Sequence, residues 1–407
     1  MNSKERREKR YVNRQRKRQE KFESLYNLEF EDVLSFEKLC DAGKDTCKGV
    51  RWKGSTIDFE TKMLSYLAKE YHKLKENKRD FKGFSSFKLI EHGKEREINA
   101  LLINERAYQK SITRNLLLPV IGNKLIYDNS ASLTTKGMDF FLKRLKKHLR
   151  DHYRKYRLSG GIYKFDFKSY FASIPHDKIK ELFKKYIKNE QLYNLICNII
   201  DDFQLMVCSD APDKYHGIGL GSEISQVIAL CYVNKIDHYV KEKYRIKGYG
   251  RYMDDGYIIS DSLETLKQIK KDIYRIAEEL GIKMNNKKNI IIPFKNNSFT
   301  FLKFRISITN TGKIILKLNK KSIRAMIRKM NIFRKWLNEG TIKPEDIFTS
   351  YQSWRSHARR CNSYNTLRNL DKKFIEMFRE ELRQRDKPFP CTIKAQLKEN
   401  GWSYLEN

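Results

Sequence analysis

The feature that most constrains this chain is a set of acidic residues inside strand-like sequence. The segment GRYMDDGYII at 250–259 places Asp254 and Asp255 side by side between runs rich in tyrosine and isoleucine. A third acid, Asp166, lies in KFDF within the alternating segment GIYKFDFKSY at 161–170. Charged side chains are rarely left in such a strand without a partner. Any fold of this chain must therefore place these acids next to solvent or next to positively charged groups.

An acid at the turn of a β-hairpin can point off the end of its sheet and avoid the buried face. We expect Asp254 to lie at such a turn, with Asp166 in the middle of an adjacent strand. Carboxylates that meet in this way form a hard oxygen site that suits Mg²⁺. Two such ions about 3.5–4 Å apart can bind the attacking and leaving oxygens of a phosphoryl transfer. The alternatives are a solvated turn for Asp254 and a lysine salt bridge for Asp166.

The charge balance indicates a polyanionic partner. The 407 residues include 84 Lys and Arg against 50 Asp and Glu, a formal net charge of +34. Such a surface attracts polyanions, with nucleic acid as the first candidate and an anionic membrane as the second. Hydrophobic residues make up 40% of the chain, which is enough for packed cores. No apolar run reaches the roughly 18–20 residues that span a bilayer, so we expect no membrane partner.

The cysteines and the N-terminal sequence indicate the cellular compartment. The seven cysteines are scattered and form no CxxC pair, which argues for reduced thiols in a cytoplasmic protein without structural zinc. The basic start, MNSKERREKRYVNRQRKRQEK, is not followed by an apolar segment. It is therefore not a secretory signal, and it is either a solvated helix or tail or a basic arm on nucleic acid.

The order of periodic segments predicts an α+β fold. Strand-like FSSFKLI and EINALLI flank the turn HGKE, and IIIPF and FTFLKFRISIT follow an amphipathic helix at 262–281. Helical spacing also appears at 105–118, at 137–156, in one long helix after the glycine-rich HGIGLG, and from 320 onward. The middle of the chain reads βα–α–ββ–α–ββ, which is typical of a sandwich with a largely antiparallel sheet.

Three motifs in this order resemble the palm of reverse transcriptases: Asp166-x₄-Phe171, Gly221-x₃-Ser225-Gln226 and Tyr252-Met253-Asp254-Asp255. Four further segments resemble the finger motifs, the short basic motif after the palm helix, the primer grip and the thumb helix of that family. They are KEREINALLINERAYQ at 94–109, MNNKKN at 284–289, FLKF at 301–304 and SWRSHARRCNSYNTL at 353–367. The resemblance covers roughly residues 80–370 and implies a right-hand polymerase fold of fingers, palm and thumb.

The resemblance also implies domains, cofactors and partners. The expected domains are a basic N-terminal extension at 1–70, fingers at 71–160, a palm at 161–308 with a finger insertion at about 176–215, a helical thumb at 309–385 and a tail at 386–407. The segment after the thumb is too short for an RNase H or an endonuclease, so we expect a polymerase alone. The implied cofactor is a pair of Mg²⁺ ions, with Mn²⁺ as an alternative. The implied partners are template RNA, a primer with its cDNA, and dNTPs.

The family's site residues fall on named positions of this chain. Asp166 and Asp254 would bind both metals with the backbone carbonyl of Phe167, and Asp255 would support them. Phe171 would block the 2′-hydroxyl of a ribonucleotide and so select dNTPs, although a core phenylalanine is the alternative. Other nucleotide-binding residues would be Arg96 (with Lys94 as its rival), Arg106, Gly221, Gln226 and Lys288, the last of which could equally be a solvated lysine. The primer grip would be Phe301, Leu302, Lys303 and Phe304.

Two branches of the family remain open. LGSEISQ at 220–226 has the LGxxxSQ form of diversity-generating retroelements, which copy a template RNA with errors at adenines, usually beside a small basic accessory protein. Lys303, however, replaces the glycine of the family's FLGF hairpin, and residues 1–70 do not match that group. Anti-phage defence reverse transcriptases, which use their own structured noncoding RNA, diverge in the same places.

Three other function classes also compete. An RNA-dependent RNA polymerase is disfavoured by Phe171, and a non-catalytic RNA-binding protein is disfavoured by the intact acids. Nothing in the sequence marks a residue for untemplated or protein-primed synthesis.

Overall fold

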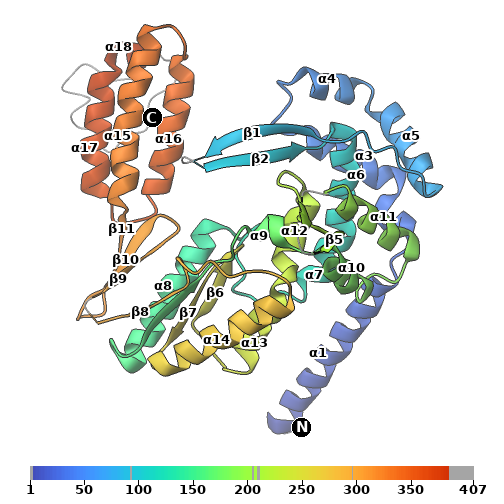
Figure 1. The fold of residues 1–407 in the computed structure, drawn as a ribbon, viewed down its shortest axis with the longest axis horizontal. Helices are drawn as coiled ribbons and strands as arrows, with labels where there is room; N and C mark the ends of the chain where they lie inside the picture. Colours follow the sequence, from blue (N-terminus) through green and yellow to red (C-terminus); the bar gives the residue numbers. More distant parts are fainter. Residues whose placement is uncertain (1–2, 92–93, 204–205, 209–210, 296, 385–407) are drawn as a thin grey trace. The chain divides into compact units, whose positions relative to one another are not determined.

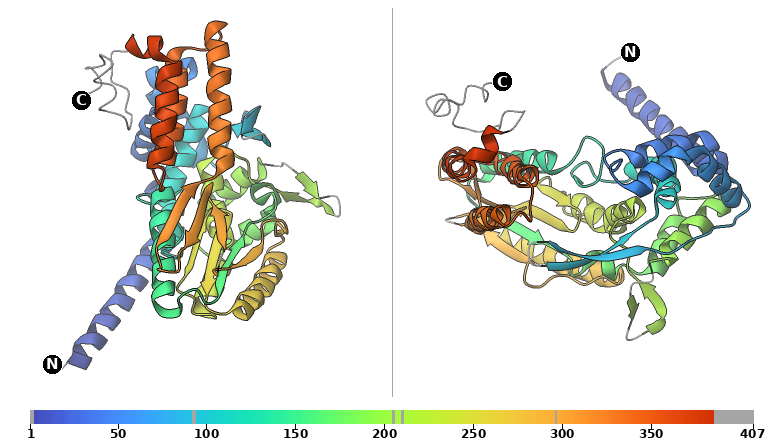
Figure 2. Two further views of the ribbon diagram at one scale, coloured as in Figure 1. Left: turned by 90° about the vertical axis from the view of Figure 1, so that its left-hand side faces the viewer. Right: turned by 90° about the horizontal axis from the view of Figure 1, so that it is seen from above.

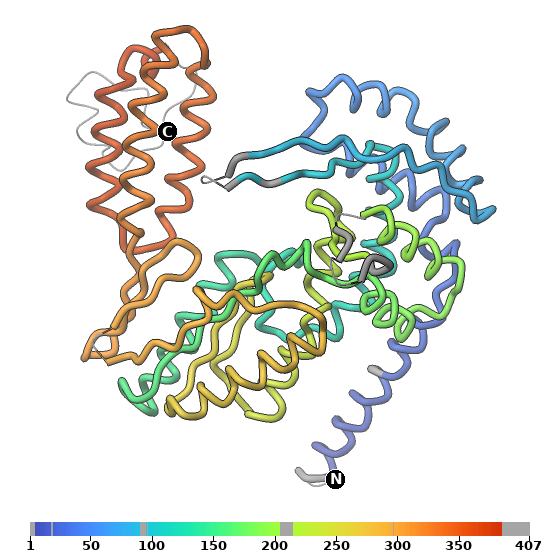
Figure 3. Tube along the Cα trace, in the orientation of Figure 1, coloured from blue at the N-terminus to red at the C-terminus, as the bar shows by residue number. Residues whose placement is uncertain are grey.

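The computed structural model describes residues 3–384 except 92–93, 204–205, 209–210 and 296 (Figures 1 and 3). The expected tail at 386–407 lies outside this part. The chain forms two compact units. The first comprises Met1–Arg144, Tyr163–Ile259 and Glu264–Ile291, and the second comprises Leu145–Ile162, Ser260–Leu263 and Ile292–Asn407.

The N-terminal part of the first unit is helical. Its helices are α1 (Ser3–Tyr26), α2 (Phe30–Leu34), α3 (Phe36–Cys47), α4 (Gly54–Thr61) and α5 (Met63–Lys75). Helices α3, α4 and α5 pack against α6 (Ile103–Ile112). Cys47, Phe59, Leu67 and Ala107 form the core between them.

The predicted hairpin before α6 is confirmed, although its second strand covers residues 94–100 instead of EINALLI at 97–103 and includes the last two residues of the expected turn HGKE. Strand β1 (Ser85–Glu91) pairs antiparallel with β2 (Lys94–Ala100), with Ser85 opposite Ala100. Helix α6 continues into a π-helical turn (Thr113–Leu117) and α7 (Leu118–Gly122), and the basic helix α8 (Met138–Tyr156) follows. A buried ion cluster holds this region together, because the guanidinium of Arg79 pairs with Asp202 and Glu105 and donates to the hydroxyl of Tyr108.

A four-stranded sheet with the order β6-β7-β3-β8 carries the acidic motifs. Its strands are β3 (Gly161–Phe165), β6 (Tyr249–Tyr252), β7 (Asp255–Ser260) and β8 (Ile290–Pro293). Strand β3 ends one residue before Asp166, which we expected in the middle of the strand. The chain stays extended there, since Phe167 makes an isolated antiparallel bridge to Met284.

Further helices and a short hairpin fall between the strands of this sheet in the sequence. They are α9 (Tyr170–Ser173), α10 (His176–Lys184), α11 (Glu190–Asp201), β4 (Met206–Cys208), β5 (Ala211–His216), α12 (Glu223–Tyr232), α13 (Asn234–Glu242) and α14 (Leu263–Glu279). The single long helix expected after the glycine-rich turn is divided between α12 and α13, at Val233. Helix α14 buries Leu266, Ile269, Ile273 and Ile276, which are three or four residues apart and form one apolar face.

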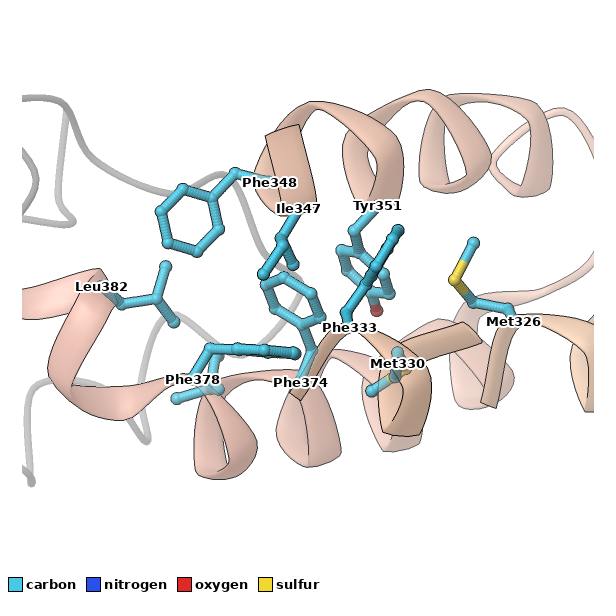
Figure 4. Packing of buried hydrophobic residues seen from close by; sticks show 10 residues of the cluster. Met326, Met330, Phe333, Ile347, Phe348, Tyr351, Phe374, Phe378 and Leu382 are labelled. Carbon is cyan, nitrogen blue, oxygen red and sulfur yellow. The ribbon is translucent and has the colours of Figure 1, made fainter. Parts of the chain in front are cut away.

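The second unit contains a three-stranded sheet and a helical bundle. The sheet has the order β11-β10-β9, from β9 (Ser298–Phe301), β10 (Phe304–Ile308) and β11 (Ile314–Leu318). The bundle consists of α15 (Lys320–Asn338), α16 (Pro344–Ala358), α17 (Tyr364–Met377) and α18 (Arg379–Arg383). Figure 4 shows its core, in which Tyr351 and Phe374 stack with ring centroids 4.0 Å apart.

These elements confirm the α+β class. The strand pairs β1–β2, β4–β5, β6–β7, β9–β10 and β10–β11 are all antiparallel. Across the described residues, every helix is too short or too polar to span a lipid bilayer. Cys40, Cys47, Cys197, Cys231 and Cys361 carry free thiols.

Candidate active site

Asp166 follows β3 directly and is 3% exposed. One of its carboxylate oxygens accepts a hydrogen bond from Nδ2 of Asn285 at 3.0 Å, and the other pairs with the ammonium of Lys288. Its backbone carbonyl accepts from the backbone N–H of Asn285 and from Nδ2 of Asn289, both at 2.9 Å. The segment MNNKKN contains these partners. It therefore fixes the position of Asp166 and places a positive charge beside its carboxylate.

Asp254 and Asp255 lie at the tip of the β6–β7 hairpin. Tyr252 pairs with Asp255, so Met253 and Asp254 alone connect the strands. Met253 has a φ of +57°, as the first central residue of a tight hairpin turn requires. The predicted hairpin turn is confirmed, and both acids remain partly exposed there.

The three carboxyl groups act on one another. The pKa of Asp255 is raised to about 7, first by burial, then by the charge of Asp254 and by a hydrogen bond with Asp166. Burial lowers the pKa of Lys288, but its hydrogen bond to Asp166 and the charges of all three acids raise it overall. The three carboxyl groups and the ammonium of Lys288 therefore lie within range of one another's charges.

The chemistry of this cluster fits a hard divalent cation. Carboxylate oxygens are the ligands that Mg²⁺ prefers, and a bound cation would offset the charge of Asp254, which adds to the effect of burial on the pKa of Asp255. Among the described residues, no three His, Cys, Asp or Glu side chains are placed to hold a metal ion together. Binding by Asp166, Asp254 and the carbonyl of Phe167 therefore stays a prediction. The ring of Phe167 is buried and stacks on Tyr170 at 5.1 Å.

Lys164 is a charged residue of this site that the sequence analysis did not single out. It is partly buried on β3, and burial lowers its pKa against the opposing effect of Asp255 and Asp166. The signal was available, because residues two apart in an extended chain share a face. Lys164 therefore lies on the same face as Asp166.

Arg251 was also missed, and it supports the hairpin turn from inside the protein. Its guanidinium donates to the carbonyl of Met253 at 2.8 Å and to that of Leu230 at 2.7 Å. It also forms an ion pair with Asp237 at 2.6 Å in which both side chains are fully buried. In the sequence this arginine resembles an ordinary surface charge, because its partner Asp237 lies 14 residues before it.

The predicted nucleotide-selection residues lie on elements around this cluster. Phe171 is half-buried on α9 and contacts Tyr170 edge-on, with ring centroids 5.9 Å apart. Gly221 has a φ of +127°, and a Cβ there would lie 2.9 Å from the carbonyl oxygen of Asn99 in β2. This glycine therefore permits a close approach to β2. Gln226 is exposed on α12.

Two predicted basic residues belong to β2 and α6. Arg96 lies opposite Leu89 in the β1–β2 hairpin, and its side chain, like that of Lys94, is outside the described part of the structure. Arg106 is exposed on α6. The roles of both in binding a triphosphate stay predictions.

The FLKF segment forms the β9–β10 turn in the second unit. Phe301 pairs with Phe304, and both rings are buried. Leu302 and Lys303 connect the strands with φ values of +45° and +70°. A two-residue turn with both φ values positive favours glycine or asparagine. Lys303 therefore adopts the conformation of the glycine that it replaces.

Comparisons with known proteins bear on this site. A family model described as "Reverse transcriptase (RNA-dependent DNA polymerase)" matches residues 77–306. Two solved structures of apo telomerase from Candida tropicalis, one of them truncated from its C-terminal domain, are each 17% identical and cover 58% of this chain. Their TM-scores are 0.44 and 0.42, and the chain covers 55% and 48% of theirs, about half their length. No curated protein matches the sequence.

Proposed function

Because the chain belongs to the reverse transcriptase family, we propose that it is an RNA-directed DNA polymerase that makes cDNA on an RNA template by two-metal nucleotidyl transfer. The carrying observation is that Asp166, directly after β3, and Asp254 and Asp255, at the β6–β7 turn, lie at one end of the same sheet, close enough for the first two to raise the pKa of Asp255. Template RNA, a primer and dNTPs are the partners that this activity needs.

Each residue has a task in this proposal. Asp166 and Asp254, with the carbonyl of Phe167, would hold two Mg²⁺ ions, or Mn²⁺ in their place. Such ions stabilise charge on the attacking and leaving oxygens. Asp255 supports the two ligands and adds negative charge. The ammonium of Lys288 is half exposed, so it can also bind a phosphate oxygen of the incoming nucleotide. The ring of Phe171 occupies the space that a 2′-hydroxyl needs.

The domain names follow from the same proposal. We assign residues 71–160 to fingers, 161–308 to a palm with a finger insertion at about 176–215, and 309–385 to a thumb. We assign Arg96, Arg106, Gly221 and Gln226 to nucleotide and template binding. Phe301–Phe304 would hold the primer end.

Primer extension on an RNA template with separate dNTPs and NTPs tests the activity. The wild-type protein should incorporate dNTPs alone, and Asp254→Asn should reduce the rate at least about 100-fold, since it removes a carboxylate charge that would hold the two metal ions. Glu278→Gln, which neutralises an exposed acid of α14, is the matched control and should leave the rate unchanged. NTP use should appear in Phe171→Ala. Equal rates for Asp254→Asn and wild type would leave only an RNA-binding role.

For the biological role we propose a retroelement of diversity-generating type, acting in the bacterial or phage cytoplasm. The LGSEISQ segment supports this, and a small basic accessory protein would accompany it. The alternative is anti-phage defence with a structured noncoding RNA, which Lys303 and the N-terminal 70 residues favour. Sequencing RNA and attached DNA that purify with the protein separates the two. Adenine-scattered cDNA from a repeat-flanked template indicates diversity generation, and repetitive or phage-triggered cDNA indicates defence.

A further inference from the structure

Most of helix α1 lies outside the packed part of the first unit (Figures 1 and 2). Every described side chain from Glu5 to Lys21 is exposed. Near its end the helix does contact the rest of the unit, since the ammonium of Lys124 lies 4.6 Å from the ring centroid of Phe22. In proteins, most of the stability of a helix comes from burial of an apolar face against the rest of the fold. Most of α1 has no such burial.

The charges of α1 are sorted by face. Arg7, Arg10, Arg14, Lys17 and Lys21 follow one another at steps of three and four residues, so they form one row along the helix. We call these five residues the basic row. The acids of the helix lie outside this row: Glu5, Glu8, Glu20 and Glu23.

Partners for the acids are found away from the basic row. Glu20 pairs with Arg16 at 3.5 Å, and Glu23 accepts a hydrogen bond from Gln19 at 2.8 Å. Within the described residues, no member of the basic row forms an ion pair. Like charges three or four residues apart destabilise a helix. The row therefore presents repelling cations that a bound polyanion would neutralise.

The composition of α1 indicates which class of polyanion its basic row would bind. A membrane-surface helix needs an apolar face, but residues 3–21 contain only two large apolar side chains, Tyr11 and Val12. Binding of single strands relies on rows of aromatic side chains that stack on bases, and the basic row has none. A duplex instead presents its phosphates along a rigid backbone. The row extends about 21 Å from Arg7 to Lys21, at about 1.5 Å per residue.

We infer that the basic row of α1 binds the phosphate backbone of a double-stranded stem in an RNA. The identification of that RNA as the template of cDNA synthesis rests on the proposed function. The binding itself requires only the charges and the straight helix. Helix α1 projects from the unit, whereas Asp166 follows β3 of the sheet, so the basic row adds a second point of attachment for a structured RNA (Figure 1).

A matched pair of double variants tests this inference in the full-length protein. Arg10→Gln/Arg14→Gln removes two charges from the basic row, and Lys9→Gln/Arg16→Gln removes two charges from the same helix outside it. Glutamine has nearly the helix propensity of arginine and lysine, and far-ultraviolet circular dichroism verifies the helix content. Binding of a labelled, blunt-ended RNA duplex is measured over a series of salt concentrations without nucleotides. A failure of polymerase activity therefore cannot affect the result.

The row variant should bind the duplex more weakly, and the slope of log K against log salt should fall by about 0.9 for each lost phosphate contact. The control variant should match the wild type in affinity and slope. Equal losses in both variants, or no loss in either, would overturn the inference. It would also be overturned if the row variant lost affinity for anionic phospholipid vesicles or for single-stranded RNA but kept its affinity for the duplex.

Discussion

Arg251 and Asp237 form an ion pair in which neither side chain is exposed to solvent. The same guanidinium donates to the carbonyl of Met253, the residue before Asp254. The hairpin turn that carries two of the candidate catalytic acids is therefore fixed from within the protein. The geometry of the acids depends on a buried charge that itself touches no substrate.

Arg251→Met should lower the free energy of unfolding by about 3–5 kcal/mol, because it leaves the carboxylate of Asp237 buried without its cation. Denaturant unfolding of the full-length protein measures this loss. Primer extension should slow as well, since Met253 loses a hydrogen bond from the guanidinium. A loss of less than about 1 kcal/mol, the typical value of an exposed pair, would show that water reaches this site.

A compensated variant separates stability from positioning. Arg251→Met combined with Asp237→Leu and Tyr249→Phe removes the cation, the anion and the hydroxyl that donates to that anion. Replacement of a buried pair by apolar residues is often neutral for stability. We expect the unfolding free energy to recover largely while kcat stays low and KM for dNTP changes little. Full recovery of kcat would limit Arg251 to a stabilising role.

Under the proposed function, Lys288 should make opposite contributions to metal binding and to nucleotide incorporation. Its ammonium pairs with the Asp166 carboxylate that a divalent cation would also bind. Lys288→Met should therefore tighten Mn²⁺ binding in titration calorimetry. The incorporation rate should fall because a cation near the nucleotide phosphates is lost. Lys287→Met, a neighbouring exposed position, is the control and should change neither quantity. Weaker Mn²⁺ binding in Lys288→Met would mean that the lysine helps to assemble the metal site.

Local features of this site could be predicted from the sequence, whereas most of its tertiary contacts could not. Local alternation and the tyrosine-aspartate hairpin predicted β6, β7 and the position of Asp254, because such patterns depend on neighbours in the chain. Asp166 was expected within a strand, yet β3 ends at Phe165. A lysine partner for Asp166 was one of the two alternatives, and Lys288 provides it. Asn289 and the partner of Arg251, Asp237, could not be predicted, since they reach the site through tertiary packing that no local period encodes.

Strain at the β9–β10 turn can be relieved by one substitution. Lys303 has a φ of +70°, a conformation that costs a residue with a Cβ about 1 kcal/mol or more relative to glycine. Lys303→Gly should therefore raise the free energy of unfolding of the full-length protein by up to about 1 kcal/mol. Lys317→Gly, in the exposed part of β11, should instead lower it by about 0.5–1 kcal/mol. A loss of stability in Lys303→Gly would show that the lysine side chain contributes more than its backbone strain costs.

His357 should make the stability of the protein depend on pH. Its ring stacks on Phe304 with centroids 4.5 Å apart, and its Nε2 is buried without a hydrogen-bond partner among the described residues. Burial lowers the pKa of His357, and the charges of Lys303 and Arg360 lower it further. Below about pH 6.5, the ordinary pKa of histidine, the unfolded chain binds a proton that the folded protein excludes. Stability therefore falls as the pH falls through this window.

His357→Phe keeps the stacking surface and removes the titration. Its unfolding free energy should fall less than that of the wild type between pH 7 and pH 5. At pH 8 and above, the histidine is neutral in both the folded and the unfolded state. The difference in unfolding free energy between the two proteins should then no longer depend on pH and should reflect packing alone. Denaturant midpoints over this pH series provide the measurement. If both proteins lost the same stability between pH 7 and pH 5, the acid sensitivity would come from other groups and the ring of His357 would be free to take up a proton in the folded state.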